Sequence, residues 1–424
     1  MKASEKIKKA DYTYDINTSK KDKKSTICLS VCHLISEISN IFLSTFLIAH
    51  IYSLTSNIYE YAKNVALYQF FTYLTMFVTY FIFSYFVDKT NRIWIYRLAV
   101  VFKTIFIIVA IFYGEDLAKI IILAGFLHGI SHAAYYSSYN VLKQEMVSRK
   151  SIGNFTVIIK ICAKSISVIF PIILGALIEI STFSLVAVYV FILSVIQLII
   201  SLFIKAKKPK NSSYQLLEYL KKLKTNPSVK NKFGSIYILA LFYGFITAIS
   251  ALLSINIMME FGSNFSLGAM TSIFALVSVM GLLLMNKFTK RGKRSWLYIT
   301  ASISLIASAI LFACITNITT LIIYNFCFVL SEIVLGINFE VYRNQNIKEA
   351  GLYDDIAEHQ TITECCMQIA RMISFGILFI VSLIGNHFVF QFAFIIFILL
   401  FTIMAPILIK YEKQNSNQDS VKNQ

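Results

Sequence analysis

The feature that most constrains this sequence is a series of twelve apolar stretches, each close to the roughly 20 residues that a membrane-spanning helix needs. They lie near residues 27–50, 64–87, 98–113, 119–140, 154–178, 183–204, 233–258, 265–286, 296–315, 317–340, 361–384 and 387–409. A longer basic connection, residues 205–232, separates the first six stretches from the last six. The pattern predicts an all-α integral membrane protein whose 12 transmembrane helices form two six-helix bundles, residues 26–204 and 233–409.

The basic residues fall almost wholly on alternate connections. Of the 39 Lys and Arg residues, 33 lie on the side of both tails, only Lys63 and Lys119 lie on the other, and four are inside predicted spans. Basic residues near the ends of spans are retained on the cytoplasmic side. We therefore expect a multi-pass protein of the cell membrane with both termini cytoplasmic: residues 1–25 as a disordered tail, residues 410–424 as the second tail, and residues 341–360 as a cytoplasmic loop.

The composition excludes several classes of protein. The net charge of +17 does not indicate nucleic acid as a partner, because the excess lies on loops beside the membrane. It favours attraction of these loops to anionic membrane lipids. No connection is long enough for a soluble catalytic domain, no glycine-rich loop could hold ATP, and no cysteine has zinc-ligand spacing with His. We expect no enzyme, no cofactor and no metal site, in a chain that acts as a monomer.

The loop after the second stretch carries a motif. It contains Ser84, Asp88, Lys89, Asn91 and Arg92. This run resembles the loop signature of the major facilitator superfamily, Gly-x-x-x-Asp-Arg/Lys-x-Gly-Arg/Lys-Arg/Lys. Three residues match, and Ser84 and Asn91 stand in place of the two glycines. With the span count and the central connection, the chain resembles the bacterial twelve-span members of that superfamily along nearly its whole length.

In that family, spans one, four, seven and ten line a central cavity, so the resemblance implies polar faces on these four helices. The sequence has them: Ser30, His33, Glu37, Asn40 and Ser44 in span one; His128, His132, Tyr135 and Tyr139 in span four; Tyr243, Thr247, Ser250 and Ser254 in span seven; Asn325, Glu332 and Glu340 in span ten. Spans six, nine and twelve have almost no ionisable group. Because a charged group in hydrocarbon is costly, this contrast separates cavity helices from lipid-facing ones.

Four residues are candidates for proton coupling. A mid-span carboxylate has its charged form disfavoured, so Glu37 could bind and release protons as the cavity changes sides. The alternative is a structural carboxylate that accepts hydrogen bonds, and Glu332 has the same two interpretations. Glu340, near the inner surface, is expected to be only solvated. His128 and His132 share a helical face and could form a proton relay, a metal site or ordinary polar packing.

Basic residues inside the spans need partners. Arg371 could pair with Glu332 or Glu364, the interpretation we favour, or it could hold an acidic group of a substrate through its planar fork. Lys164 is expected deep in the cavity. Lys103 is expected to pack against a carboxylate or carbonyl group.

The family signature also implies a conformational gate formed by Asp88, Lys89, Arg92 and Glu364. Asp88 would lie against the amino end of span eleven, near residues 361–364, where the helix dipole favours negative charge. We expect acidic residues of the preceding loop to strengthen the gate by facing basic residues of the first bundle: Asp354, Asp355 and Glu358 against Lys143, Arg149 and Lys150.

The sequence thus predicts a secondary active transporter that moves a small molecule, amphiphilic or aromatic, by alternating access with proton coupling. Pro171 and Gly175 partly match a Gly-Pro-x-x-Gly element that resembles those of exporters, which favours efflux. Gly125, however, occupies the position of a membrane-embedded Arg in proton-coupled exporters, so their coupling scheme cannot be carried over intact. Two alternatives stay open: a transporter-shaped sensor or partner subunit without transport, and an integral-membrane transferase acting on lipid-linked substrates.

Overall fold

The fold is a bundle of long helices. The computed structural model describes residues 20–422 except 56, 148–151, 207–213, 226, 262, 289–294 and 350–354. Twelve helices in this part of the chain are long and apolar enough to cross a membrane, and each overlaps one of the predicted stretches. The predicted all-α class with twelve spans is confirmed.

The helices fall into two sets of six spans. The first set, called the N-half, contains α2 (Lys20–Ile41), η1 (Phe42–Phe46), α3 (Leu47–Ser53), α4 (Ile58–Lys89), α5 (Arg92–Phe112), η2 (Leu117–Ile120), α6 (Ile121–Met146), α7 (Ile152–Ile180) and α8 (Phe183–Ser201). A short helix, α9 (Leu216–Thr225), lies in the central connection. The second set, called the C-half, contains α10 (Pro227–Gly244), α11 (Ile246–Phe261), α12 (Asn264–Phe288), α13 (Ser295–Cys314), α14 (Ile318–Ser331), η3 (Glu332–Gly336), α15 (Ile337–Glu349), α16 (Ile356–Ile384), α17 (His387–Thr402) and α18 (Met404–Lys422).

Several helices extend beyond the predicted apolar stretches, among them α2, α15 and α18, of which the last ends at Lys422. Helix α2 begins at Lys20, so residues 20–25 of the predicted disordered tail are helical. Helix α15 continues to Glu349 through much of the predicted loop at 341–360. Its sequence contains neither Gly nor Pro, the residues that most strongly end a helix, so the spanning helix extends beyond its apolar part.

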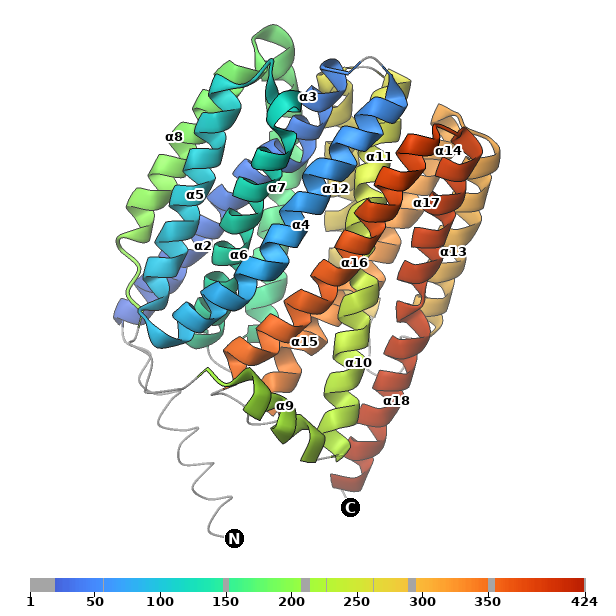
Figure 1. The fold of residues 1–424 in the computed structure, drawn as a ribbon. Coiled ribbons are helices and arrows are strands. Elements are labelled where there is room, and N and C mark those ends of the chain that lie inside the picture. Colours follow the sequence, from blue (N-terminus) through green and yellow to red (C-terminus); the bar gives the residue numbers. More distant parts are fainter. Residues whose placement is uncertain are drawn as a thin grey trace.

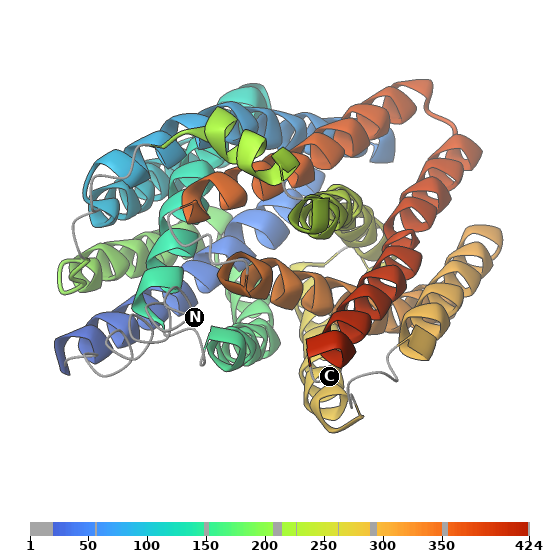
Figure 2. The ribbon, with the colours of Figure 1, turned by 90° about the horizontal axis from the view of Figure 1, so that it is seen from below.

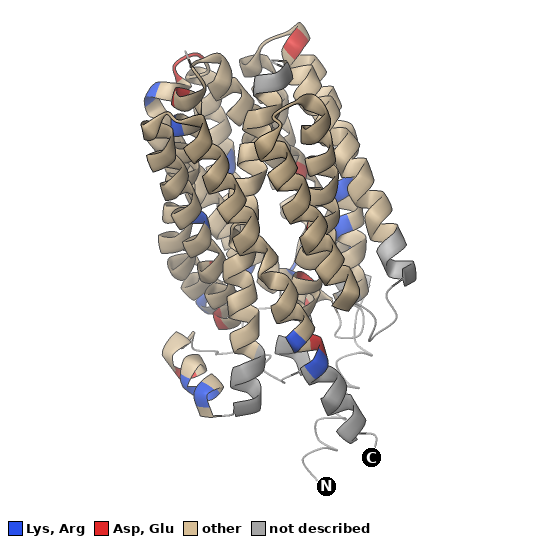
Figure 3. Cartoon of the chain, turned by 90° about the vertical axis from the view of Figure 1, so that its right-hand side faces the viewer, with Lys and Arg blue, Asp and Glu red and all other residues tan. Residues whose placement is uncertain are grey.

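In Figure 1 the N-half and the C-half lie side by side, and α2 begins at the same face where α18 ends. We call this the terminal face. Helix α9 lies at the terminal face beside α10, in the side view and in the view from below (Figures 1 and 2). The charged residues of the described chain gather toward the two ends of the bundle, and only a few lie along the spans (Figure 3).

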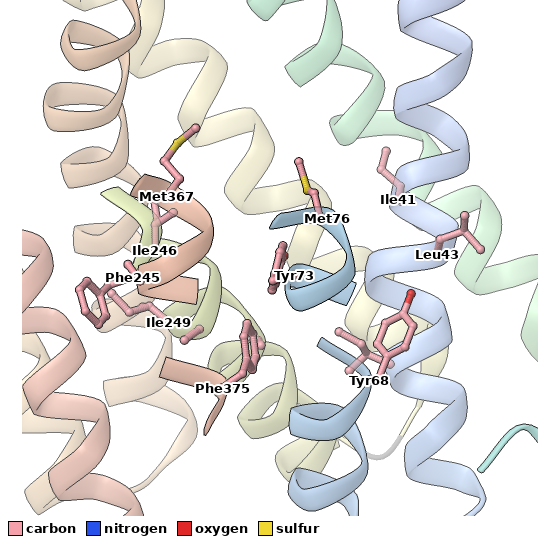
Figure 4. Close-up of a cluster of buried hydrophobic side chains, with 14 of the residues drawn as sticks. Ile41, Leu43, Tyr68, Tyr73, Met76, Phe245, Ile246, Ile249, Met367 and Phe375 are labelled. Atoms are coloured by element: carbon pink, nitrogen blue, oxygen red, sulfur yellow. The ribbon is translucent and has the colours of Figure 1, made fainter. Parts of the chain in front are cut away.

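Two helix pairs carry most of the contact between the halves: α4 packs on α16, and α7 packs on α12. In the first pair, the ring of Tyr73 stacks on that of Phe375 with centroids 5.7 Å apart, within a buried apolar cluster (Figure 4). In the second pair the backbones approach closely. A Cβ added at Gly175 would lie 2.6 Å from the carbonyl oxygen of Asn264, so only glycine permits this approach.

Candidate functional site

Three of the four helices that were expected to line the cavity are irregular. Span one contains the π-helical segment η1 (Phe42–Phe46), and span ten contains η3 (Glu332–Gly336). Span seven is interrupted at Phe245, between α10 and α11. Single π-helical turns inside α-helices occur frequently at functional sites. Two predicted site residues, Ser44 and Glu332, lie within such turns.

Spans one and four bring several predicted residues together. His33 Nδ1 and the Tyr135 hydroxyl share a hydrogen bond of 2.7 Å, and the His33 ring stacks on Tyr139 with centroids 4.4 Å apart. Glu37 lies one turn further along α2, with Oε1 3.9 Å from His33 Nδ1, and accepts a 3.5 Å hydrogen bond from Asn40 Nδ2. A carboxylate, an imidazole and a phenol are therefore contiguous, which is a geometry through which a proton can pass.

Lys103 is buried at the centre of the N-half. Its Nζ donates to Ser36 Oγ at 2.7 Å and to Gln197 Oε1 at 3.2 Å, and Gln197 Nε2 donates to the Tyr96 hydroxyl at 3.2 Å. The amide oxygen is the carbonyl partner that the sequence led us to expect. This network joins spans one, three and six, so it stabilises the N-half internally.

Two ion pairs connect the halves. Lys164 Nζ of α7 lies 3.4 Å from Glu332 Oε1 in η3, and Lys160 Nζ lies 2.5 Å from Glu340 Oε2 in α15. The expectation that Glu340 is only solvated was wrong, because Lys160 of α7 faces it across the contact between the halves. Around the first pair is a cavity of about 20 Å³, room for about one water molecule. It is lined by Lys160, Lys164, Tyr243, Ser278, Leu282, Glu332, Ile333, Gly336 and Ile337.

Arg371 of α16 lies where the halves meet. Its Nε donates to Thr247 Oγ1 at 3.0 Å, and one terminal nitrogen donates to Gln368 Oε1 at 3.2 Å. The guanidinium carbon lies 5.1 Å from the ring centroid of Tyr73, which belongs to α4 in the N-half. All these partners are neutral.

The favoured ion pairing of Arg371 was therefore wrong. Glu332 is paired with Lys164, and Glu364 accepts a 3.0 Å hydrogen bond from Arg343. The second pair is buried, and Arg343 competes successfully for Glu364 because the unbroken α15 carries it inside the bundle. Among the described residues, no carboxylate lies within ion-pair distance of Arg371.

Polar contacts close the terminal face between the halves. Gln144 Nε2 of α6 donates to Asn344 Oδ1 of α15 at 3.1 Å, and both side chains are buried. The Tyr214 hydroxyl, just before α9, donates to Thr361 Oγ1 at 3.4 Å, while its ring meets Tyr85 of α4 edge to face with centroids 6.2 Å apart. Residues just before α9 thus touch both halves at this face.

The predicted gate is only partly visible. The Asp88 side chain lies outside the described residues. Lys89 donates to the Tyr85 hydroxyl of its own helix, and Arg92 forms an ion pair with Glu145 of α6, inside the N-half. Since Glu364 is bound to Arg343, the described part of the gate does not form the expected cluster with Glu364.

Helix α9 is fixed to the C-half. Lys222 Nζ lies 2.9 Å from Asp355 Oδ1, and this hydrogen bond raises the pKa of Lys222. The Gln215 backbone N–H donates to Glu358 at 2.9 Å. Tyr219, a residue of α9, is fully buried, and burial raises the pKa of its phenol. The short connecting helix is therefore attached to the C-half by an ion pair and a hydrogen bond.

The expectation that Asp355 faces the basic residues of the N-half was wrong, because Lys222 on α9 reaches it first. Lys143 instead lies over the ring of Tyr139, 5.6 Å from its centroid. Three other members of that expected set lie outside the described residues: Asp354, Arg149 and Lys150.

The remaining candidates make local contacts. His128 Nδ1 bonds to the Tyr68 hydroxyl at 2.5 Å, and its ring meets that of His132 edge to face with centroids 4.1 Å apart. Asn325 is fully buried and donates to the Leu321 carbonyl of its own helix. Hydroxyls that donate within their own helices belong to Ser44, Ser250 and Ser254. Where the structure describes the chain, no group of three or more His, Cys, Asp and Glu residues could hold a metal ion.

Sequence reasoning missed neutral polar residues that turn out to be central. Gln144 and Asn344 connect the halves, Gln197 and Ser36 hold Lys103, and Tyr73 covers Arg371. The only signal for most of them was a polar residue inside an apolar stretch, which does not reveal the direction it faces.

The comparison with protein families decides the class of this molecule. The model of the Major Facilitator Superfamily matches residues 26–344. The chain belongs to this superfamily. It is thus a multi-pass secondary transporter with the alternating-access fold, from a family that binds small-molecule substrates and is typically non-enzymatic.

Solved structures agree with this assignment of the superfamily fold. The human organic anion transporter MFSD10 (TETRAN) is 12% identical, with a TM-score of 0.60 and 90% of this chain and 99% of that chain covered. A bacterial homologue of the iron transporter ferroportin is 13% identical in its inward-facing state, with a TM-score of 0.64 over 92% of this chain and 98% of that one. In its outward-facing state this homologue is 14% identical, with a TM-score of 0.61 over 93% of this chain and 100% of that one. A search of curated proteins finds no significant match.

Proposed function

We propose that the protein moves a small molecule across the cell membrane by rocking residues 26–204 against residues 233–409. The observation that carries this proposal is the placement of two ion pairs, Lys164–Glu332 and Lys160–Glu340, between the halves. An ion pair between two units that move relative to each other can exist in one conformational state and break in the other.

The transport is driven by protons, with Glu37 as the group that titrates. Its neighbours His33 and Tyr135 give a path for the proton, and its side chain keeps 26% exposure, so water can reach it. Glu332, His128 and His132 are secondary candidates. The latter two belong to α6, where His128 bonds to Tyr68 of α4.

The terminal face is cytoplasmic, because the basic connections lie on it and attract anionic lipids. The direction of transport is efflux, because Pro171 and Gly175 partly match an element of exporters. The backbone at both residues packs closely on α12. The chain acts as a monomer. The proteins of similar fold are described as an organic anion transporter and a bacterial homologue of an iron transporter, and at 12–14% identity they indicate no substrate for this chain.

Purified protein in vesicles with an imposed pH gradient tests this function. A panel of labelled organic acids, amines and neutral aromatics should include compounds whose flux follows the gradient and collapses with a protonophore. Flux of none of them, in either direction, would reject proton-driven transport and favour the sensor or partner-subunit alternative.

A further inference from the structure

The guanidinium of Arg371 has more N–H donors than its described hydrogen bonds use. A guanidinium carries five N–H groups, and hydrogen bonds to Thr247 and Gln368 use two of them. The side chain is only partly buried, so the remaining donors are not sealed in the core. Gln368 is fully buried, and its Nε2 has no hydrogen-bond partner among the residues that the structure describes. Two adjacent side chains therefore present unused N–H donors at one place.

The charge balance of the spans also indicates that Arg371 could bind an acidic group. The basic residues of the described spans include Lys103, Lys143, Lys160, Lys164, Arg343 and Arg371. The acidic residues of these spans include Glu37, Glu145, Glu332, Glu340, Glu358 and Glu364. Glu332, Glu340 and Glu364 are already paired with Lys164, Lys160 and Arg343, and Glu145 is paired with Arg92. A positive charge in a membrane interior needs a counter-charge, and Arg371 has none among the described residues.

The position of Arg371 suits a transported molecule. Its partners Thr247 and Gln368 belong to the C-half, and the Tyr73 ring that covers it belongs to the N-half. Thr247 follows the interruption of span seven at Phe245. A ligand bound here would touch both halves and could sense their movement.

We propose that Arg371 and Gln368 bind the acidic group of the transported molecule, an organic carboxylate whose apolar body packs against aromatic side chains such as Tyr73. The planar fork of Arg371 matches the two oxygens of a carboxylate, and Gln368 Nε2 supplies a further donor. Thr247 fixes the fork by accepting from Nε. This inference rests on the proposed function for its meaning, but binding of the carboxylate is measurable without transport.

Three probes of nearly equal shape test the proposal: benzoate, benzamide and benzamidine, which are anionic, neutral and cationic. Ligand binding to the folded state raises the unfolding temperature. With the purified full chain, benzoate should raise it at millimolar concentration, whereas the other two should not. Arg371→Lys keeps the charge without the fork and should weaken benzoate binding at least tenfold, and Arg371→Gln should abolish it.

Gln368→Leu serves as a second variant, because it removes the orphan donor and leaves every charge in place; we expect weaker benzoate binding. The matched control is Lys119→Gln, which removes an exposed basic residue paired with Asp116 far from the site and should bind benzoate normally. Absence of a benzoate effect, equal effects of the three probes, or unchanged binding in a folded Arg371→Gln protein would overturn the proposal. If benzoate binds as expected but no flux occurs in vesicles, the site stands and the transport function falls.

Discussion

The ion pair between Lys160 and Glu340 should hold the terminal face closed, and Glu340→Gln should open it. The two charged atoms lie 2.5 Å apart, and the side chains are 29% and 20% exposed. Charges about 4 Å apart attract by about 4 kcal/mol at an effective dielectric constant of about 20. Desolvation and solvent screening of partly exposed groups reduce the net value to about 1–2 kcal/mol. The closed population should therefore fall roughly fivefold to thirtyfold relative to the open one.

Distances between spin labels measure this shift. Labels at Thr90→Cys and Lys410→Cys, in a cysteine-free background, report on the two halves at the terminal face, since both residues are exposed there. Glu340→Gln should move the distance distribution toward longer values. The charge swap Lys160→Glu with Glu340→Lys should restore the original distribution.

The control is an exposed ion pair that does not connect the halves. Lys119 and Asp116 pair within one turn of the chain, and their side chains are 77% and 58% exposed. Lys119→Gln should leave the label distances unchanged. An unaltered distribution in Glu340→Gln, or equal shifts in Glu340→Gln and Lys119→Gln, would refute the reasoning that this contact biases the two states.

Three further predictions concern other contacts within the bundle. Glu37→Gln keeps the shape and removes the titration, so pH-driven flux in vesicles should vanish while ligand binding persists; full flux would refute the proton role. Gly268→Val should lower the free energy of unfolding by about 1–3 kcal/mol, because an added Cβ already lies 2.3 Å from the Pro171 carbonyl oxygen. Gly234→Ala, where a Cβ meets nothing within 4 Å, should not, and equal unfolding temperatures would contradict this contrast. Lys103→Met leaves two acceptors without a donor in the N-half and should cost about 1–3 kcal/mol in denaturant unfolding; no loss would show that the network is dispensable.

The spans were predictable because hydropathy is a local property. The free energy of placing a helix in hydrocarbon is a sum over its own residues, so a window of sequence contains the information. The partners of charged residues depend instead on how helices distant in sequence are rotated. Lys164 and Glu332 are 168 residues apart, and neither sequence position indicates the other. Arg343 shows how a boundary error affects the site. The predicted span ended at residue 340 and placed Arg343 in a loop, whereas the structure buries it beside Glu364.

Irregular turns interrupt three of the helices that were expected to line the cavity, and span twelve, which was expected to face lipid, is interrupted in a similar way at Ile403. In hydrocarbon every backbone polar group needs a partner, so a break in a spanning helix is tolerated only where neighbouring protein or enclosed water supplies one. Phe42, Leu43 and Phe46 of η1 are buried, and the same turn exposes Ser44, so the irregular backbone is packed on one side and open on the other. Where the structure describes the chain, π-helical turns occur in spans one and ten, α10 and α11 meet at a break in span seven, and α17 and α18 meet at a break in span twelve. We expect these helices to bend at these points if the halves rock as proposed, so the proposed ligand site at Arg371 can change shape while the packing of each half is kept.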